Sequence, residues 1–218
     1  MIFETLARGT AGYLNSDTCA REYSAKFGLP RGPSPFLEPE VQAKVMRWSE
    51  ARRGLDWSYG GWMENRRFLW KGTYLEKLGT FLHLGVDFNA PAGTPVFLDH
   101  PAQVLRIDND TPLAGGWGTS VAFKLFDAPV VLLYGHLDPR VSFEKGVIVR
   151  PKVPFGMVGR PKDNGGWYSH THVQAIRDDV FPVYDGLRWG ELDGYGREDN
   201  LATLSRVYLD PLQYVRIA

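Results

Sequence analysis

The sequence predicts a mainly β protein with an antiparallel core and a helical N-terminal extension. Between residues 94 and 177, short apolar runs alternate with Gly, Pro, Asp and Asn, which are typical turn residues. Spacing of this kind is typical of an antiparallel sandwich or a partly open barrel. The 218 residues, 44% of them hydrophobic, are enough for one well-cored domain with an extension.

The N-terminal part of the chain favours helices. Residues 18–27 have weak helical character, and Gly28 immediately after them can end a helix. From Glu38 the pattern is clearer, because Pro39 suits a first helical turn, an apolar stripe follows, and Gly54 can cap the end. We therefore expect residues 1–68 to form an extension with one amphipathic helix, packed on the core.

Residues 56–70 are rich in aromatic side chains, with Trp57, Tyr59, Trp62, Phe68 and Trp70. Large rings usually seal the end of a small β core, and we favour that interpretation. A second interpretation is that some of them form the wall of a binding groove, since aromatic rings can stack on a flat ligand. The short distance in sequence to the histidine motifs described below leaves that role open.

The core and the C-terminal segment follow in order. The strand candidates are residues 95–98, 102–107, 118–125, 130–137, 147–150, 156–159 and 170–176. They fall in a central unit, residues 69–177. Residues 178–218 are polar and Gly-rich at first and then offer a short helix at 200–207, so we expect a C-terminal strap packed on the core.

Composition excludes several classes of protein. The 25 basic and 25 acidic residues balance, so no global field favours nucleic acid or an anionic membrane as a partner. The single cysteine, Cys19, excludes an internal disulfide, and no segment approaches the roughly 20 apolar residues of a membrane span. The N-terminal sequence lacks the features of a signal peptide, which predicts a cytoplasmic location.

Histidines in three separate segments carry the chemistry that the sequence suggests. His83 stands four residues before Asp87, His136 lies in YGHLD, and His170 and His172 lie in SHTHVQ. Alternation along a strand places His170 and His172 on one face, and likewise Tyr134 and His136. The three segments could therefore aim their imidazoles into one cleft.

This set of residue types suits a metal ion. Imidazole nitrogen and carboxylate oxygen are good zinc ligands, and a catalytic zinc keeps three protein ligands and one position for water. Gly85 relieves crowding between His83 and Asp87, and one of the two histidines of HTH can supply the third ligand. His100, outside every motif, is expected to be structural.

The motifs HLGVD, YGHL and HTH, in this order, resemble the signature of the lysostaphin-type zinc metalloendopeptidases, a family that includes LytM-like and β-lytic enzymes. The resemblance covers roughly residues 69–177. It implies a duplicated hybrid motif, a barrel-sandwich-hybrid-like antiparallel core. It also implies that His83, Asp87 and His172 bind Zn²⁺, whereas His136 and His170 are catalytic histidines that do not bind the metal.

The function implied by this resemblance is a zinc-dependent hydrolase, a metallopeptidase that cleaves an amide bond in a glycine-rich or peptidoglycan peptide or in a small amide. Two alternatives remain. The protein could be a metal enzyme that acts on another small molecule, or a non-catalytic binding or regulatory module. Retention of the complete ligand set argues against the second alternative. The sequence leaves the oligomeric state open.

The NGGW segment just before His170 is the candidate for substrate contacts. Gly165 and Gly166 would let backbone amides approach a peptide closely, Trp167 can supply an apolar wall, and Asn164 completes the segment. A plain turn closed by a core tryptophan is an equally good interpretation.

Overall fold

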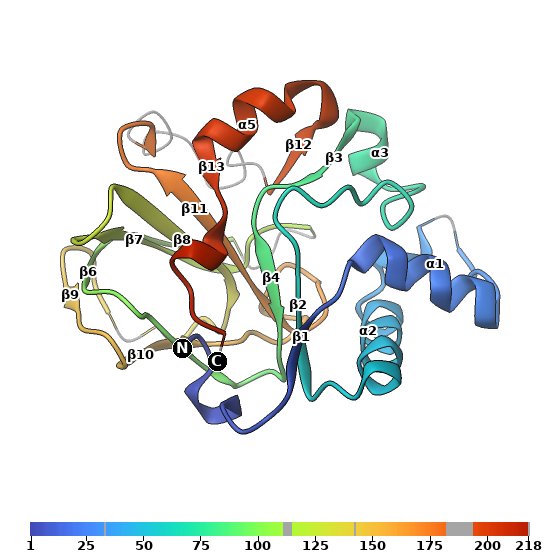
Figure 1. The fold of residues 1–218 in the computed structure, drawn as a ribbon, viewed down its shortest axis with the longest axis horizontal. Coiled ribbons are helices and arrows are strands. Elements are labelled where there is room, and N and C mark those ends of the chain that lie inside the picture. The colour runs from blue at the N-terminus through green and yellow to red at the C-terminus, as the bar shows by residue number, and fades with distance from the viewer. Residues whose placement is uncertain (33, 111–114, 142, 182–193, 218) are drawn as a thin grey trace.

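The computed structural model describes residues 1–32, 34–110, 115–141, 143–181 and 194–217. Within them, nine strands form one curved sheet in the order β1-β2-β4-β11-β8-β7-β6-β9, with β13 against β11 (Figure 1). Its strands are β1 (Ala11–Tyr13), β2 (Trp57–Gly60), β4 (Val86–Asn89), β6 (Ala102–Asn109), β7 (Thr119–Leu125), β8 (Val130–Leu137), β9 (Ile148–Val149), β11 (His170–Arg177) and β13 (Tyr208–Leu209). Only β1 and β2 pair in parallel among these described strands.

Two smaller strand pairs and several helices complete the described structure. The strands β5 (Pro95–Phe97) and β10 (Pro154–Met157) pair, as do β3 (Thr80–His83) and β12 (Tyr195–Arg197). The helices are α1 (Ser16–Phe27), α2 (Pro39–Arg53), α3 (Tyr74–Leu78) and α5 (Leu201–Val207). Short 3-10 turns are η1 (Glu4–Leu6), η2 (Pro35–Leu37), η4 (Glu198–Asn200) and η5 (Pro211–Gln213). The prediction of a mainly β, largely antiparallel fold with N-terminal helix is confirmed.

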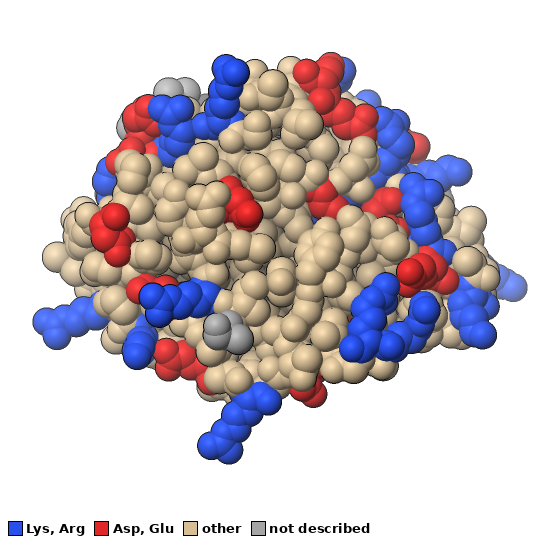
Figure 2. Space-filling view, in the orientation of Figure 1, with Lys and Arg blue, Asp and Glu red and all other residues tan. Residues whose placement is uncertain are grey.

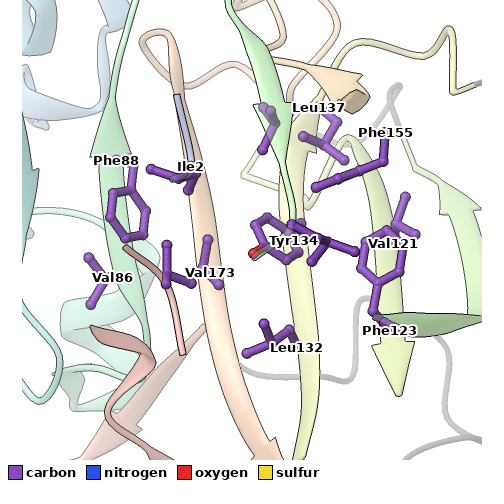
Figure 3. Packing of buried hydrophobic residues seen from close by; sticks show 14 of the residues in the cluster. Ile2, Val86, Phe88, Val121, Phe123, Leu132, Tyr134, Leu137, Phe155 and Val173 are labelled. Carbon is purple, nitrogen blue, oxygen red and sulfur yellow. The ribbon is translucent and has the colours of Figure 1, made fainter. Parts of the chain in front are cut away.

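Each strand candidate of the central unit overlaps one strand, from β5 to β11, although β10 begins two residues before its candidate. The reason is visible in the central core, where alternate residues of β4, β11 and β8 interdigitate (Figure 3). Phe88, Val173 and Leu132 come from these three strands and are fully buried. Burying such side chains contributes roughly 1.5–3 kcal/mol each, which is why the period of two in the sequence persists in the structure.

The helices of the extension pack beside the sheet (Figure 1). α2 begins at Pro39 and ends at Gly54, whose φ of 64° is the left-handed conformation expected of a helix C-cap. α1 is longer and better capped than its weak pattern indicates, because the Asn15 side chain accepts a 2.8 Å hydrogen bond from the Thr18 backbone N–H. The extension thus holds two main helices. Cys19 of α1 is buried in the apolar cluster that also contains Val45 and Met46 of α2.

The N-terminal segment also takes part in the central sheet and core. β2 pairs antiparallel with β4, and Ile2 and Phe3 are fully buried in the same cluster as Phe88. The two termini lie side by side, where the Ile2 N–H donates to the Arg216 carbonyl at 3.0 Å (Figure 1). The sheet therefore continues across the expected boundary at residue 69. In the expected strap, β13 packs on β11, while residues 182–193 lie outside the described residues.

The surface is of mixed charge. On the face shown in Figure 2, basic and acidic side chains are interspersed, mainly toward its edges. In the part of the chain that the structure describes, no helix has the length and apolar character needed to cross a membrane.

Candidate metal centre

The pairing of β4 with β11 assembles most of the candidate site. Asp87 lies opposite His172, and Asn89 lies opposite His170. Directly opposed residues of an antiparallel pair project from the same face, so Asp87, His170 and His172 share one face of the sheet. On the opposite face of the same strands, Phe88 and Val173 pack in the central core. One register therefore sets both the core and the site.

His136 reaches the same site by a different route. Gly135 lies opposite His172, and Tyr134 lies opposite Val173, so regular alternation would leave His136 on the core side with Tyr134. His136 instead has a φ of 62°, in the left-handed region, and its ring centroid is 4.6 Å from that of His170. The prediction that Tyr134 and His136 share a face is wrong for this reason. Tyr134 lies in the core (Figure 3).

Three candidate ligand atoms form a small triangle. His172 Nδ1 lies 2.8 Å from Asp87 Oδ1 and 2.9 Å from His83 Nε2. His83 Nε2 is 3.2 Å from Asp87 Oδ1. Ligands about 2.0–2.1 Å from a tetrahedral zinc would be separated by about 3.3 Å, so small adjustments of these side chains suffice for them to share one ion. The chemistry and spacing of this buried group fit a metal ion.

Neighbouring backbone groups orient the two imidazoles of the triangle. His83 Nδ1 donates to the Gly61 carbonyl at 3.0 Å, which turns Nε2 toward Asp87 and His172. Gly85 lies against the His172 ring, where a Cβ on residue 85 would come within 2.6 Å of Nε2. Glycine is therefore needed between His83 and Asp87, in agreement with the expected relief of crowding.

A buried arginine holds the carboxylate in place. Arg66 Nη1 donates to Asp87 Oδ2 at 2.6 Å and to the Tyr195 hydroxyl at 3.0 Å. Its Nε donates to Glu64 Oε1 at 3.1 Å, and Glu64 in turn accepts from the Ser16 backbone N–H at 2.8 Å. Because Oδ2 of Asp87 is engaged by Arg66, Oδ1 is left for the triangle.

Burial and charge together set the protonation states. Burial alone would raise the pKa of Asp87, but His83 and Arg66 lower that pKa well below its usual value. Burial lowers the pKa of His172 to about 4, and it also lowers the pKa values of His136 and His170. The site at neutral pH therefore combines an ionised Asp87 carboxylate with neutral imidazoles at His136, His170 and His172; an ionised carboxylate and a neutral imidazole are the forms that bind metals.

His136 and His170 are held alike. His136 Nδ1 donates to the Asn164 carbonyl at 2.9 Å, and His170 Nδ1 donates to the Tyr168 carbonyl at 2.8 Å. A carbonyl oxygen only accepts, so in both neutral rings Nε2 carries the lone pair. His170 Nε2 is 3.5 Å from Asp87 Oδ1. Both rings line the same cavity as Asp87 and His172.

The NGGW segment divides into supporting and lining residues. The Asn164 side chain accepts from the Trp167 N–H at 3.0 Å and donates to the Tyr168 carbonyl at 3.2 Å, so it shapes the turn that supports His136. Gly165 and Gly166 have φ values of 87° and 86°, as a tight turn requires. Trp167 lines the cavity. The role of these residues in binding substrate stays a prediction.

The other residues singled out in the sequence analysis lie outside the triangle of candidate ligands. Trp57 and Tyr59 pack in the central core, which fits the sealing role, whereas Trp70 lines the cavity, which fits the groove-wall role. His100 pairs with Asp127 at 2.8 Å near the surface. The sequence analysis did not single out Glu64, Arg66 or the Gly61 carbonyl as parts of the site.

Solved structures similar to this chain include peptidases of the type that the sequence motifs resemble. One is a catalytic-domain mutant of the prophage-encoded M23 protein EnpA from Enterococcus faecalis, with 26% identity, a TM-score of 0.38, and coverage of 44% of this chain and 68% of that one. Another is the catalytic domain of the antimicrobial peptidase lysostaphin from Staphylococcus simulans, with 19% identity, a TM-score of 0.40, and coverage of 57% and 80%.

A zinc-containing peptidase from Vibrio cholerae is also similar, with 20% identity and a TM-score of 0.39. That similarity covers 45% of this chain but only 28% of the Vibrio protein. No protein-family model matches the chain, and no curated protein matches it.

Proposed function

We propose that this protein is a zinc-dependent hydrolase that cleaves an amide bond, with a peptide or a small amide as substrate. The observation that carries the proposal is the triangle of His83, Asp87 and His172 beside two further neutral histidines in one cavity. Three protein ligands with an adjacent cavity are typical of a catalytic zinc, because a fourth position stays open for water or substrate.

His83, Asp87 and His172 would hold the ion. A zinc bound there would polarise the scissile carbonyl and lower the pKa of a bound water. His136 and His170 would handle the protons. Each offers an Nε2 lone pair to the cavity, so one can accept a proton from the attacking water and pass it to the leaving amine. The other can stabilise the developing oxyanion once its Nε2 carries a proton. The described structure places no glutamate in the cavity lining, so these histidines are the candidate bases.

Metal analysis tests the first half of the proposal. Protein purified without chelator should carry about one zinc per chain. Absence of any transition metal, together with a Tm that added zinc leaves unchanged, would contradict a metal site.

An activity panel tests the second half. Zinc-loaded protein should cleave at least one of four substrate groups: oligoglycine, peptidoglycan peptides, ordinary peptides and small amides. If zinc binds but every group resists hydrolysis, the amide hydrolase assignment is wrong and the metal site stands.

A further inference from the structure

The metal centre opens into a cavity of about 420 Å³ whose walls are mainly apolar. This volume lies within the usual range for small-molecule sites, about 300–1,000 Å³. It is more than twice the roughly 150 Å³ of an engineered apolar cavity that accepts benzene. The space is thus large enough for a bulky apolar group placed directly beside the candidate zinc ligands.

The N-terminal extension builds the wall that makes this space a pocket. η2 contributes Phe36, and α2 contributes Val45 and Met46. Leu69 and Trp70 follow from the segment after β2. All of these side chains are buried, and they belong to a cluster distinct from the central core. Elements outside the three histidine motifs therefore determine the shape of the space around the metal centre.

Several polar groups in the wall are already engaged within the protein. Gln42 donates to the Phe36 carbonyl and accepts from the Tyr168 N–H at 3.3 Å. The Tyr168 hydroxyl donates to Asn89. Arg66 bonds to Glu64, Asp87 and the Tyr195 hydroxyl. An apolar substrate side chain leaves these bonds intact. Arg66 Nη2, Trp70 Nε1 and Thr80 Oγ1 belong to lining residues and have no hydrogen-bond partner among the described residues, so the preference for an apolar group rests on the apolar character of most of the wall.

Apolar character continues to the mouth of the pocket. Tyr74 and Leu78 of α3 both line it, and their side chains are 43% and 58% exposed. Large apolar side chains at this exposure lose water when a ligand covers them, which favours an apolar ligand. A glycine-only peptide has no side chain with which to cover these residues or fill the space behind them.

We propose that the preferred substrate carries a large apolar group directly next to the scissile amide, seated in the pocket that α2, α3 and Trp70 enclose. This inference rests on the proposed function, because it names the substrate class of the same site. It predicts preference for Leu or Phe over Gly beside the cleaved bond.

A matched peptide series tests the preference. Blocked peptides would differ only in having Gly, Ala, Leu or Phe on one side of the scissile amide, and a second series would vary the other side. In one of the two series, kcat/KM should rise about 10- to 100-fold from Gly to Leu or Phe, as expected for burying such a side chain. Equal or better cleavage of the all-glycine peptide would overturn the inference and leave the hydrolase assignment in place.

A binding measurement separates the pocket from catalysis. Alkyl hydroxamates, which bind zinc through their head group, would be titrated into zinc-loaded protein from the acetyl to the hexanoyl member. Affinity should rise about fourfold for each added methylene. A flat series would contradict the pocket even if peptides are cleaved, and a rising series would support it even if the peptide panel fails.

Two variants locate the effect. Leu78→Asp, at the exposed mouth, should reduce kcat/KM for the Leu or Phe peptide at least fivefold more than for the Gly peptide. Leu201→Asp is the matched control, because Leu201 is 45% exposed on α5 and does not line the cavity. Val45→Phe, which narrows the pocket from within, should act in the same direction with zinc content unchanged. Equal effects of Leu78→Asp and Leu201→Asp would place the apolar group elsewhere and overturn the inference.

Discussion

The two faces of β11 are equally buried but are stabilised in opposite ways. On the core face, Val173 and Ala175 pack against apolar neighbours and need no particular partner. On the site face, His170 and His172 are also buried, yet each has a specific hydrogen-bond partner. Burial alone therefore does not distinguish a core from a site. The difference lies in whether the buried atoms need directional partners.

The site face obtains those partners from distant parts of the chain. The Gly61 carbonyl orients His83, and Arg66 orients Asp87, although both belong to the segment before the histidine motifs. A substitution that shortens one side chain on the core face should lower stability but leave the site intact, because packing free energy is spread over many contacts. The site face should instead lose function when one partner is removed.

The largest expected difference is between two adjacent residues of β11. His172→Ala should remove most of the bound zinc and reduce hydrolysis to the background rate, because two ligands hold the ion poorly. Val173→Ala, on the other face, should keep about one zinc per chain while lowering the free energy of unfolding by roughly 2 kcal/mol. Elemental analysis and chemical unfolding of both variants provide the check. Retention of zinc by His172→Ala would show that the ligand set is wrong.

Within the site face, ligands and proton carriers should also differ. His136→Ala and His170→Ala should keep their zinc but lose turnover by on the order of 100-fold or more, because they act on protons and the oxyanion. Steady-state rates would be compared with metal content measured on the same samples. If either variant loses its metal, that histidine is a ligand, and an exchange of roles between His170 and His172 is the first alternative to examine.

Substitution of two neighbouring arginines, one buried in the site and one exposed, tests whether the partner of Asp87 is required for metal binding. Arg66→Met leaves Glu64 and Asp87 as unpaired buried carboxylates, which should cost about 3–5 kcal/mol of stability. Loss of the hydrogen bond that orients Asp87 should also weaken zinc binding roughly 10- to 100-fold.

Arg67→Met is the matched control. The Arg67 side chain is 59% exposed and pairs with Glu198 at 2.9 Å on the surface. Its loss should change stability by no more than about 1 kcal/mol. Unfolding curves and competition with a zinc chelator would measure both quantities. Similar behaviour of the two variants would remove Arg66 from the metal centre.

The smallest effect expected is a pH dependence of the zinc-free protein. Burial lowers the pKa of His172 to about 4 in the folded state, below the usual value of 6.5. Between these two pH values the unfolded chain binds the proton and the folded chain does not, so stability falls as the pH drops from about 6.5 to about 4. Burial of His136 and His170 lowers their pKa values too and acts in the same direction.

Unfolding of zinc-free protein at several pH values would measure this slope. His172→Asn should make it shallower. His100→Asn, at the surface beside Asp127, serves as the comparison. An unchanged slope in His172→Asn would mean that His172 does not gain a proton on unfolding.

Much of the fold was accessible from the sequence because it depends on local periodicity. Short apolar runs between turn residues marked β5 to β11, and Pro39 and Gly54 marked both ends of α2, since turn chemistry and strand propensity act between near neighbours. In these cases the information lay within a few residues of the feature it described. The ligand set of His83, Asp87 and His172 was implied instead by the resemblance of the motifs HLGVD, YGHL and HTH to a known family.

Only the tertiary structure decided the rest. The left-handed φ of His136 takes it out of strand alternation. Gly135 beside it can indicate an irregular position in the strand, but it does not specify toward which face the His136 side chain turns. The pairing of Arg66 with Asp87 joins residues on separate segments. Part of the apolar wall over the metal centre comes from η2 and α2, whose sequences carry no mark of the site. These features depend on which distant segments pack together. Local patterns specify the faces of strands and helices, whereas the partner of each buried polar group is set by the packing of the whole chain.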